Sequence, residues 1–282
     1  METVLLVMYL TKRCFKMYYF NNELNKFDIL KIPEEQHQSI KGLPVSEVGL
    51  LVAPGATGKS MFVLNLILAS CGLTYNHLIE KPVKTLYVSL EDRLEDIQRR
   101  LYAYKKALNI SETTLQETEL DFKIIENKST ERLIEKGVNQ KDNKFFQELN
   151  SIISDGKYEL VIIDTLIKSY TGFEENNNAD MAMVLSHFNN MAIDNQCSVL
   201  LLHHTNKGAI GQNADINQSI SRGASSLVDN SRFVLSLSKN EYDTGIICQS
   251  IKTNFSAPTR CEYMRAYKGA LICEESEHEL VA

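Results

Sequence analysis

The chain has 282 residues, of which 44% are hydrophobic and 23% charged, a balance typical of a globular protein with an ordinary core. Its formal net charge of −6 argues against a protein that coats nucleic acid with its whole surface, because such binding needs a basic field. A local basic channel is still compatible with that charge. The six cysteines include no C-x-x-C pair, so they indicate neither a zinc site nor a disulfide framework and favour a reduced, cytoplasmic location.

The beginning of the chain does not resemble a targeting or membrane segment. Residues 4–10 are apolar and precede basic residues, which is the wrong charge order for a secretory signal, and the run is far too short to span a membrane. We therefore expect no membrane association. Met8 and Met17 remain alternative starts of translation.

From residue 48 onward, short apolar runs alternate with helical patterns. Residues 48–53 predict a buried strand and 58–73 a helix that is apolar on nearly every side. The same reading gives strands at 86–90, 122–125, 160–163 and 199–202, and helices at 91–108, 145–153 and 181–192. The polar segment 109–119 is typical of a loop. Strands that alternate with helices in this way predict a mostly parallel sheet flanked by helices.

The pattern changes after residue 206. Residues 207–221 are rich in Gly, Asn, Gln and Ser and lack apolar periodicity, which predicts a loop. Residues 233–237, 245–253 and a pair of strands around Lys268 and Gly269 predict an antiparallel extension of the sheet at its edge. The expected fold class is therefore α/β with an antiparallel C-terminal extension.

Residues 53–60, APGATGKS, match the Walker A pattern for phosphate binding, except that Ala53 holds the first glycine position. A strand before the loop and a helix after it direct backbone N–H groups at phosphates. Lys59 can then reach the β- and γ-phosphates of ATP, and the Ser60 hydroxyl can bind Mg²⁺. The predicted nucleotide-binding residues are Pro54, Gly55, Ala56, Thr57, Gly58, Lys59, Ser60 and Met61.

Acidic residues end two of the predicted strands. Asp164 follows the apolar run 160–163, where a Walker B carboxylate holds the Mg²⁺ shell, although an aspartate there can also simply cap the next segment. Glu91 ends the strand 86–90, where a carboxylate can deprotonate the attacking water. Asp92 is the competing candidate, and both acids can also stabilise the start of the following helix.

Two basic groups follow the strand 199–202. Adjacent strand side chains point to opposite faces, so only one of His203 and His204 can face the site. That imidazole can hydrogen-bond the γ-phosphate, or it can be a core histidine. Arg222 follows the loop 207–221, where a guanidinium can stabilise a neighbouring subunit's phosphoryl group or can lie on the surface.

Six segments, in this order, resemble the RepA-type family of plasmid replicative helicases, within the RecA-like P-loop superfamily. They are LVAPGATGKSMF at 51–62, LYVSLED at 86–92, LVIIDTL at 160–166, CSVLLLHHTNKGA at 197–209, SRGASSLVDNSRF at 221–233 and IKTNFSAP at 251–258. The resemblance implies a RecA-like ATPase domain over residues 43–282, preceded by an N-terminal segment, 1–42, that makes subunit contacts or has a poorly defined start.

The resemblance also implies roles for individual residues. It assigns Lys59 and Ser60 to phosphate and Mg²⁺, Asp164 to Walker B and Glu91 to the catalytic base. His204 would sense the γ-phosphate. Two further basic residues would act toward a neighbouring nucleotide, namely Arg222 as a finger acting in trans and Lys252 as a second cation.

The implied function is that of an ATP-dependent, homohexameric helicase that moves 5′ to 3′ on single-stranded DNA, with residues 207–221 facing the strand. The chain carries no primase, zinc or helix-turn-helix pattern, so we expect separate initiator and primase proteins as partners. Two alternatives remain: a RecA-like ATPase that loads or remodels DNA-bound proteins without unwinding, and a nucleotide-binding switch that barely hydrolyses ATP.

Overall fold

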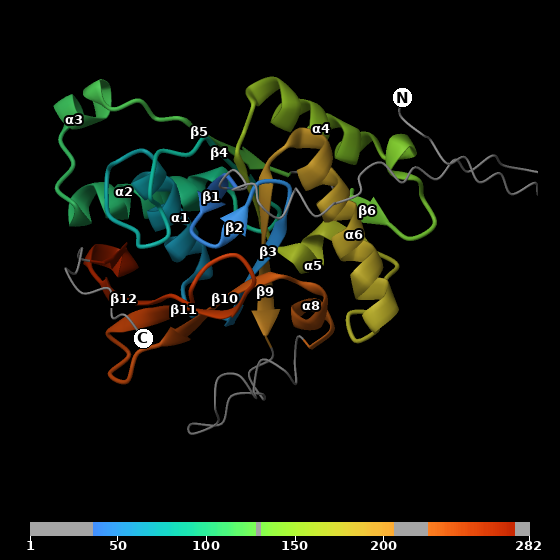
Figure 1. Cartoon of the computed structure of the whole chain (residues 1–282). Helices are drawn as coiled ribbons and strands as arrows, with labels where there is room; N and C mark the ends of the chain where they lie inside the picture. The colour runs from blue at the N-terminus through green and yellow to red at the C-terminus, as the bar shows by residue number, and fades with distance from the viewer. Residues whose placement is uncertain (1–35, 128–130, 206–224, 274–282) are drawn as a thin grey trace, which may run out of the picture. The chain divides into compact units, whose positions relative to one another are not determined.

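The computed structural model describes residues 36–127, 131–205 and 225–273 (Figure 1). The chain divides into two compact units, Met1–Gln36 and His37–Ala282, and every helix and strand given below belongs to the second. Within the described ranges, no helix is both long and apolar enough to cross a membrane.

One nine-stranded sheet organises the second unit. Its strands lie in the order β13 (Leu271–Ile272), β12 (Arg260–Arg265), β11 (Gly245–Thr253), β10 (Phe233–Lys239), β3 (Val48–Pro54), β9 (Ser198–Thr205), β7 (Leu160–Asp164), β4 (Thr85–Ser89) and β5 (Phe122–Glu126). The strands from β10 to β5 pair in parallel, whereas β11, β12 and β13 pair antiparallel. The expected α/β fold with an antiparallel C-terminal extension is confirmed.

Helices cover both faces of the sheet. Helices α1 (Lys59–Ser70) and α2 (Leu94–Ala107) lie on one face, and α4 (Lys144–Gly156) and α6 (Asn178–Asn195) on the other (Figure 1). Alternate residues of β3 serve the two cores, because successive strand side chains point to opposite faces: Leu51 packs with the α1 side and Leu50 with the α6 side. Burial on both faces explains why these strands are apolar without interruption.

Two local features differ from the sequence prediction. The segment 109–119, predicted as a loop, contains the helix α3 (Glu112–Glu117), which has no buried residue and therefore no apolar periodicity to reveal it. Its N-cap is Ser111, whose hydroxyl accepts a hydrogen bond from the Thr114 N–H at 2.9 Å. A small hairpin of β1 (Gln38–Ile40) and β2 (Leu43–Pro44) precedes the main sheet.

The remaining elements are short. They are β6 (Ile134–Glu135), η2 (Gln140–Asp142), α5 (Leu166–Ser169), β8 (Tyr170–Thr171), α8 (Ser225–Asn230) and η4 (Tyr267–Gly269). Strands β6 and β8 form a separate parallel pair beside the main sheet.

The sheet topology brings distant segments to one edge. Strands β3, β9, β7 and β4 are consecutive neighbours and all run in the same direction, so their carboxyl ends lie together. The register pairs Ala53 with His204 and Ser89 with Asp164. Residues that end these four strands are therefore neighbours in space, which is where ligands bind in open α/β sheets.

Candidate functional site

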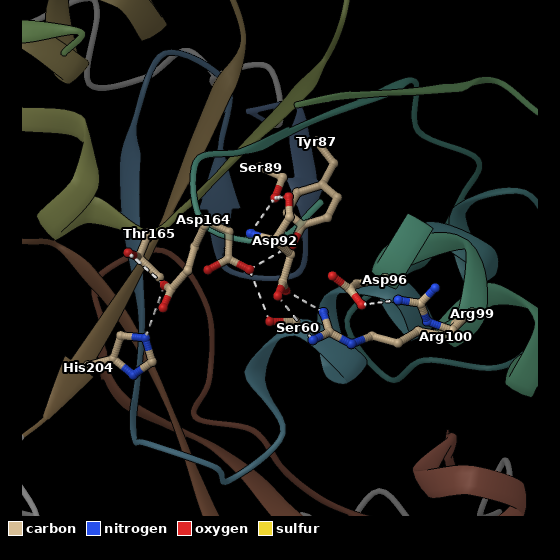
Figure 2. Close-up of polar contacts among 11 residues, drawn as sticks. Ser60, Tyr87, Ser89, Asp92, Asp96, Arg99, Arg100, Asp164, Thr165 and His204 are labelled. Carbon is tan, nitrogen blue, oxygen red and sulfur yellow. Dashed lines mark hydrogen bonds and ion pairs between the residues drawn. The ribbon is translucent and has the colours of Figure 1, made fainter. Parts of the chain in front are cut away.

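A cavity of about 280 Å³ opens at this carboxyl edge of the sheet. It combines the loop after β3 with the ends of β4, β7 and β9 and one residue from α2. Its lining residues are Ala56, Gly58, Lys59, Ser60, Met61, Glu91, Asp92, Arg100, Asp164 and His204. Figure 2 shows Ser60, Asp92, Arg100, Asp164 and His204 from these separate elements converging on one region.

The loop between β3 and α1 contains two residues with positive φ, Ala56 and Gly58. Gly58 has a φ of 118°, a value that residues with a side chain rarely adopt, and it forms the N-cap of α1. Thr57 is buried, and its hydroxyl donates to the Pro54 carbonyl at 2.9 Å. The bond between Thr57 and Pro54 thus closes the loop, while Ala56 and Gly58 line the cavity.

Lys59 is almost fully buried, with 5% of its surface exposed. Its Nζ donates to the carbonyls of Ala53 and Pro54 at 2.8 and 3.2 Å and lies 2.8 Å from Nδ1 of His204. Burial lowers the pKa of Lys59 to about 8, although the nearby charges of Asp164 and Glu91 oppose this shift. The ammonium group is therefore held at the cavity wall by the carbonyls of Ala53 and Pro54.

Asp164 is buried at the end of β7 and accepts two hydrogen bonds on Oδ2. The Ser60 hydroxyl donates at 3.1 Å and the Tyr87 hydroxyl at 2.6 Å, as Figure 2 shows. Burial raises the pKa of Asp164, and these two bonds act against that rise. The carboxylate is thereby fixed in orientation beside Ser60, in the first turn of helix α1.

Glu91 and Asp92 line the same cavity but have different partners. Glu91 Oε2 accepts from the Thr165 hydroxyl at 3.3 Å and lies 3.7 Å from Nε2 of His204. Asp92 forms an ion pair with Arg100, whose second guanidinium nitrogen donates to Asp92 Oδ1 at 3.2 Å. Because Asp92 is already neutralised by a guanidinium, Glu91 is the carboxylate better placed to accept a proton.

The two consecutive histidines of β9 point to opposite faces of the sheet. His204 is exposed toward the cavity and lies between Lys59 and Glu91. His203 is buried, and its Nε2 lies 3.6 Å from Glu175. His204 is thus the histidine that faces the site, as the strand alternation predicts.

Four of the predicted site residues that the structure describes, Pro54, Gly55, Thr57 and Lys252, are not among those that line the cavity. Arg222 and the predicted loop 207–221 lie outside the described residues. Lys252 is on β11, and its Nζ donates to the carbonyls of Val228 and Asp229 at 3.0 Å each, near the end of α8. Its assignment to a neighbouring subunit's nucleotide stays a prediction.

The site also depends on residues that the sequence did not single out. Arg100 lines the cavity, whereas its neighbour Arg99 pairs with Asp96 outside the cavity lining (Figure 2). Nothing in the sequence distinguishes these two arginines. Tyr87 belongs to a buried apolar strand, and only its hydroxyl bonds to a site residue. Thr165 directly follows Asp164, the predicted Walker B residue, and this adjacency is the only feature of the sequence that points to Thr165.

The residues present fit a magnesium ion bound with a nucleotide. Mg²⁺ prefers oxygen ligands and is usually held by one or two protein groups together with substrate phosphates. The oxygens of Ser60 and Asp164 lie 3.1 Å apart, and both residues line the cavity beside the predicted phosphate-binding loop. These two residues would hold the ion.

Comparisons with known proteins agree with this geometry. The model of a family described as an AAA domain matches residues 23–209. Among solved structures, the chain is similar to an ATPase domain, with a TM-score of 0.55 and 14% sequence identity over 82% of this chain and 85% of that one. At this identity the likeness concerns the fold alone, and it agrees with the α/β architecture expected from the sequence.

Proposed function

We propose that this chain, which belongs to the AAA domain family, binds ATP with Mg²⁺ in the cavity at the sheet edge and hydrolyses it. One observation carries the proposal. The loop between β3 and α1, the Ser60–Asp164 pair and Glu91 lie around a single cavity, and among the described residues Glu91 pairs with His204 and with no arginine. Together they supply the groups that phosphoryl transfer to water requires.

The proposed reaction assigns each group a role. A water molecule attacks the γ-phosphorus, the bond to the ADP oxygen breaks, and Glu91 accepts the proton that the water loses. Lys59 and the loop amides hold the phosphate oxygens. When bound, Mg²⁺ neutralises negative charge on the β- and γ-phosphates. His204, placed between Lys59 and Glu91, is positioned to respond to the γ-phosphate.

The finer proposal is a ring-forming helicase or translocase of a plasmid or mobile element that moves 5′ to 3′ on single-stranded DNA. It is supported by the six ordered segments that resemble RepA-type helicases. It is also supported by the placement of His204 on β9, because that strand runs directly into residues 206–224, which include the predicted DNA-facing loop. A γ-phosphate sensor next to such a loop can couple hydrolysis to movement.

Strand displacement tests the finer proposal. Purified protein would be incubated with ATP and a partial duplex that carries either a 5′ or a 3′ single-stranded tail, while phosphate release is measured in parallel. We expect hydrolysis that single strands stimulate and unwinding of the 5′-tailed substrate. DNA-stimulated hydrolysis without unwinding of either substrate would instead indicate an ATPase that loads or remodels other proteins.

Mixed rings test the proposed role of Arg222. Arg222→Ala should bind ATP but lose hydrolysis by a factor on the order of 10³, as fingers acting in trans do. Mixed with Lys59→Ala subunits, it should recover some activity, because an intact Lys59 then meets an intact Arg222 at some interfaces. Native mass measurement with and without ATP establishes whether six subunits assemble. A monomer with full ATPase activity would contradict both the proposed ring and the proposed role of Arg222 in trans.

A further inference from the structure

The last strands of the sheet are held against helix α1. The buried side chain of Asn65, on α1, donates to the Leu271 carbonyl of β13 at 2.9 Å. Tyr104, on α2, joins the same two elements, since its hydroxyl donates to the Met61 carbonyl at 2.8 Å and accepts from the Leu271 N–H at 3.0 Å. The C-terminal strands are therefore bonded to α1, the helix that directly follows the loop between β3 and α1, which we call the phosphate loop.

Arg265 reaches from this region to the phosphate loop. It is the last residue of β12, and its own N–H donates to the Thr244 carbonyl at 2.8 Å. Its guanidinium donates to the Thr57 carbonyl at 2.9 Å. Both terminal guanidinium nitrogens also lie within 4 Å of the position that a Cβ atom on Gly58 would take. A residue 208 positions away in sequence thus contacts the loop next to Lys59.

The bond to Thr57 has a consequence for the neighbouring amide. The peptide between Thr57 and Gly58 is planar and trans, so its carbonyl and its N–H point in opposite directions. Because the carbonyl is held toward Arg265, the N–H of Gly58 is held away from it, and Gly58 lines the cavity. Backbone N–H groups of this loop are the groups that bind phosphate.

We propose that Arg265 is a positioning residue for nucleotide binding, which orients the Gly58 amide by holding the Thr57 carbonyl. This inference rests on the proposed function, because it assigns phosphates to the cavity. It extends the nucleotide site to β12, which lies outside the part of the chain that the family model matches, residues 23–209. The antiparallel strands are therefore part of the ATP site and more than an edge to the sheet.

Equilibrium binding of ADP with Mg²⁺ to the full chain tests the proposal. Arg265→Ala should weaken binding about tenfold, the effect of losing one charge-assisted hydrogen bond. Arg265→Lys keeps the charge and a donor, so it should bind within about threefold of the wild type. Arg260→Ala is the matched control, because Arg260 is exposed at the other end of the same strand. It should bind like the wild type.

Steady-state kinetics separates positioning from a purely structural role. If Arg265 is a positioning residue, the substitution Arg265→Ala should raise KM for ATP and change kcat much less. The melting temperature of this variant without nucleotide should stay close to that of the wild type. Three results would each overturn the proposal. They are nucleotide binding by Arg265→Ala equal to that of the wild type, equal losses of binding in Arg265→Ala and Arg260→Ala, and a fall in the kcat of Arg265→Ala with no change in KM. If Arg265→Ala does not fold, Arg265→Lys decides: a small rise in KM supports positioning, and a kcat loss at constant KM overturns it.

The wild type distinguishes this inference from the proposed function. Protein that binds nucleotide but never hydrolyses it would remove the proposed ATPase and leave the role of Arg265 intact. Hydrolysis by the wild type together with unchanged binding in Arg265→Ala would remove only the role of Arg265. A wild type that binds no nucleotide would remove both.

Discussion

Nδ1 of His204 lies 2.8 Å from Nζ of Lys59. When Lys59 is protonated it can only donate, so Nδ1 accepts and the imidazole hydrogen is on Nε2. That nitrogen lies 3.7 Å from Glu91 Oε2. The imidazole therefore connects Lys59, the proposed phosphate-binding lysine, with the proposed catalytic base. A nucleotide that takes Lys59 as its partner would leave His204 free to contact the γ-phosphate.

His204→Ala should keep nucleotide binding but reduce kcat by about tenfold, which corresponds to one hydrogen bond worth roughly 1.4 kcal/mol in the transition state. The measurement is ATP turnover alongside ADP binding. His187→Ala, on helix α6, is the control and should leave both unchanged. Unaltered turnover in His204→Ala would show that the imidazole takes no part in the reaction.

Nucleotide affinity should depend on the protonation of Lys59. Its pKa is about 8 because of burial, so the fraction that carries a positive charge rises as the pH falls through 8. Since phosphates bind the charged form, ADP should bind about tenfold more weakly at pH 9 than at pH 7. Titration calorimetry in two buffers of different ionisation enthalpy should detect proton uptake at about pH 8.5, just above that pKa. Affinity that does not change, or that rises with pH, would contradict this role.

Tyr87→Phe should raise the Mg²⁺ concentration that supports half-maximal hydrolysis by about tenfold, as losses of such supporting hydrogen bonds do. Its hydroxyl donates to Asp164 Oδ2 at 2.6 Å and orients the carboxylate. Tyr263→Phe is the matched control, because it removes a similarly buried hydroxyl whose partner, His77, does not line the cavity. Equal Mg²⁺ requirements in both variants would mean that Tyr87 acts only in the core.

The sequence was sufficient for the order of the main-sheet strands from β3 to β11, and for the acidic residues that follow β4 and end β7, but it missed α3 and the β1–β2 hairpin. Continuous apolar runs predicted β3, β7 and β9 because these strands are buried on both faces. In parallel strands the residues after such runs meet at one edge, so Ser60, Asp164 and Glu91 could be grouped before their distances were known. The grouping of these three residues therefore follows from the pattern of apolar residues and from the sheet topology.

Side-chain direction could not be predicted in the same way. Arg99 and Arg100 are adjacent on one helix, and only the packing of α2 decides that Arg100 faces the cavity. The contact of Arg265 with Thr57 joins residues that are far apart in sequence, so no local pattern signals it. Such contacts depend on how β12 lies against the phosphate loop, which neither propensity nor spacing encodes.

His203 should contribute to stability in a pH-dependent way. Burial, with smaller effects from His204 and Lys59, lowers its pKa to about 4, so the folded protein binds fewer protons than the unfolded chain between pH 4 and 6.5. The contribution of neutral His203 to the free energy of unfolding is complete above pH 6.5. It is lost as the pH falls to 4, and the total loss is about 3 kcal/mol.

Urea unfolding at a series of pH values would measure this effect. The wild type should lose stability more steeply from pH 6.5 to 4 than His203→Phe does, whatever the absolute stability of that variant. Parallel pH profiles for the two proteins would show that His203 is not held neutral by burial.

ATP hydrolysis by Glu91→Gln is the most direct test of the proposed function. The measurement is phosphate release with and without single-stranded DNA, alongside ADP binding, for the wild type, Glu91→Gln and Asp92→Asn. The wild type should turn over ATP. Glu91→Gln should bind nucleotide normally with turnover reduced by a factor on the order of 10² or more, as expected when a general base is removed, and Asp92→Asn should lose less. Turnover by Glu91→Gln equal to that of the wild type would contradict the assignment of the catalytic base.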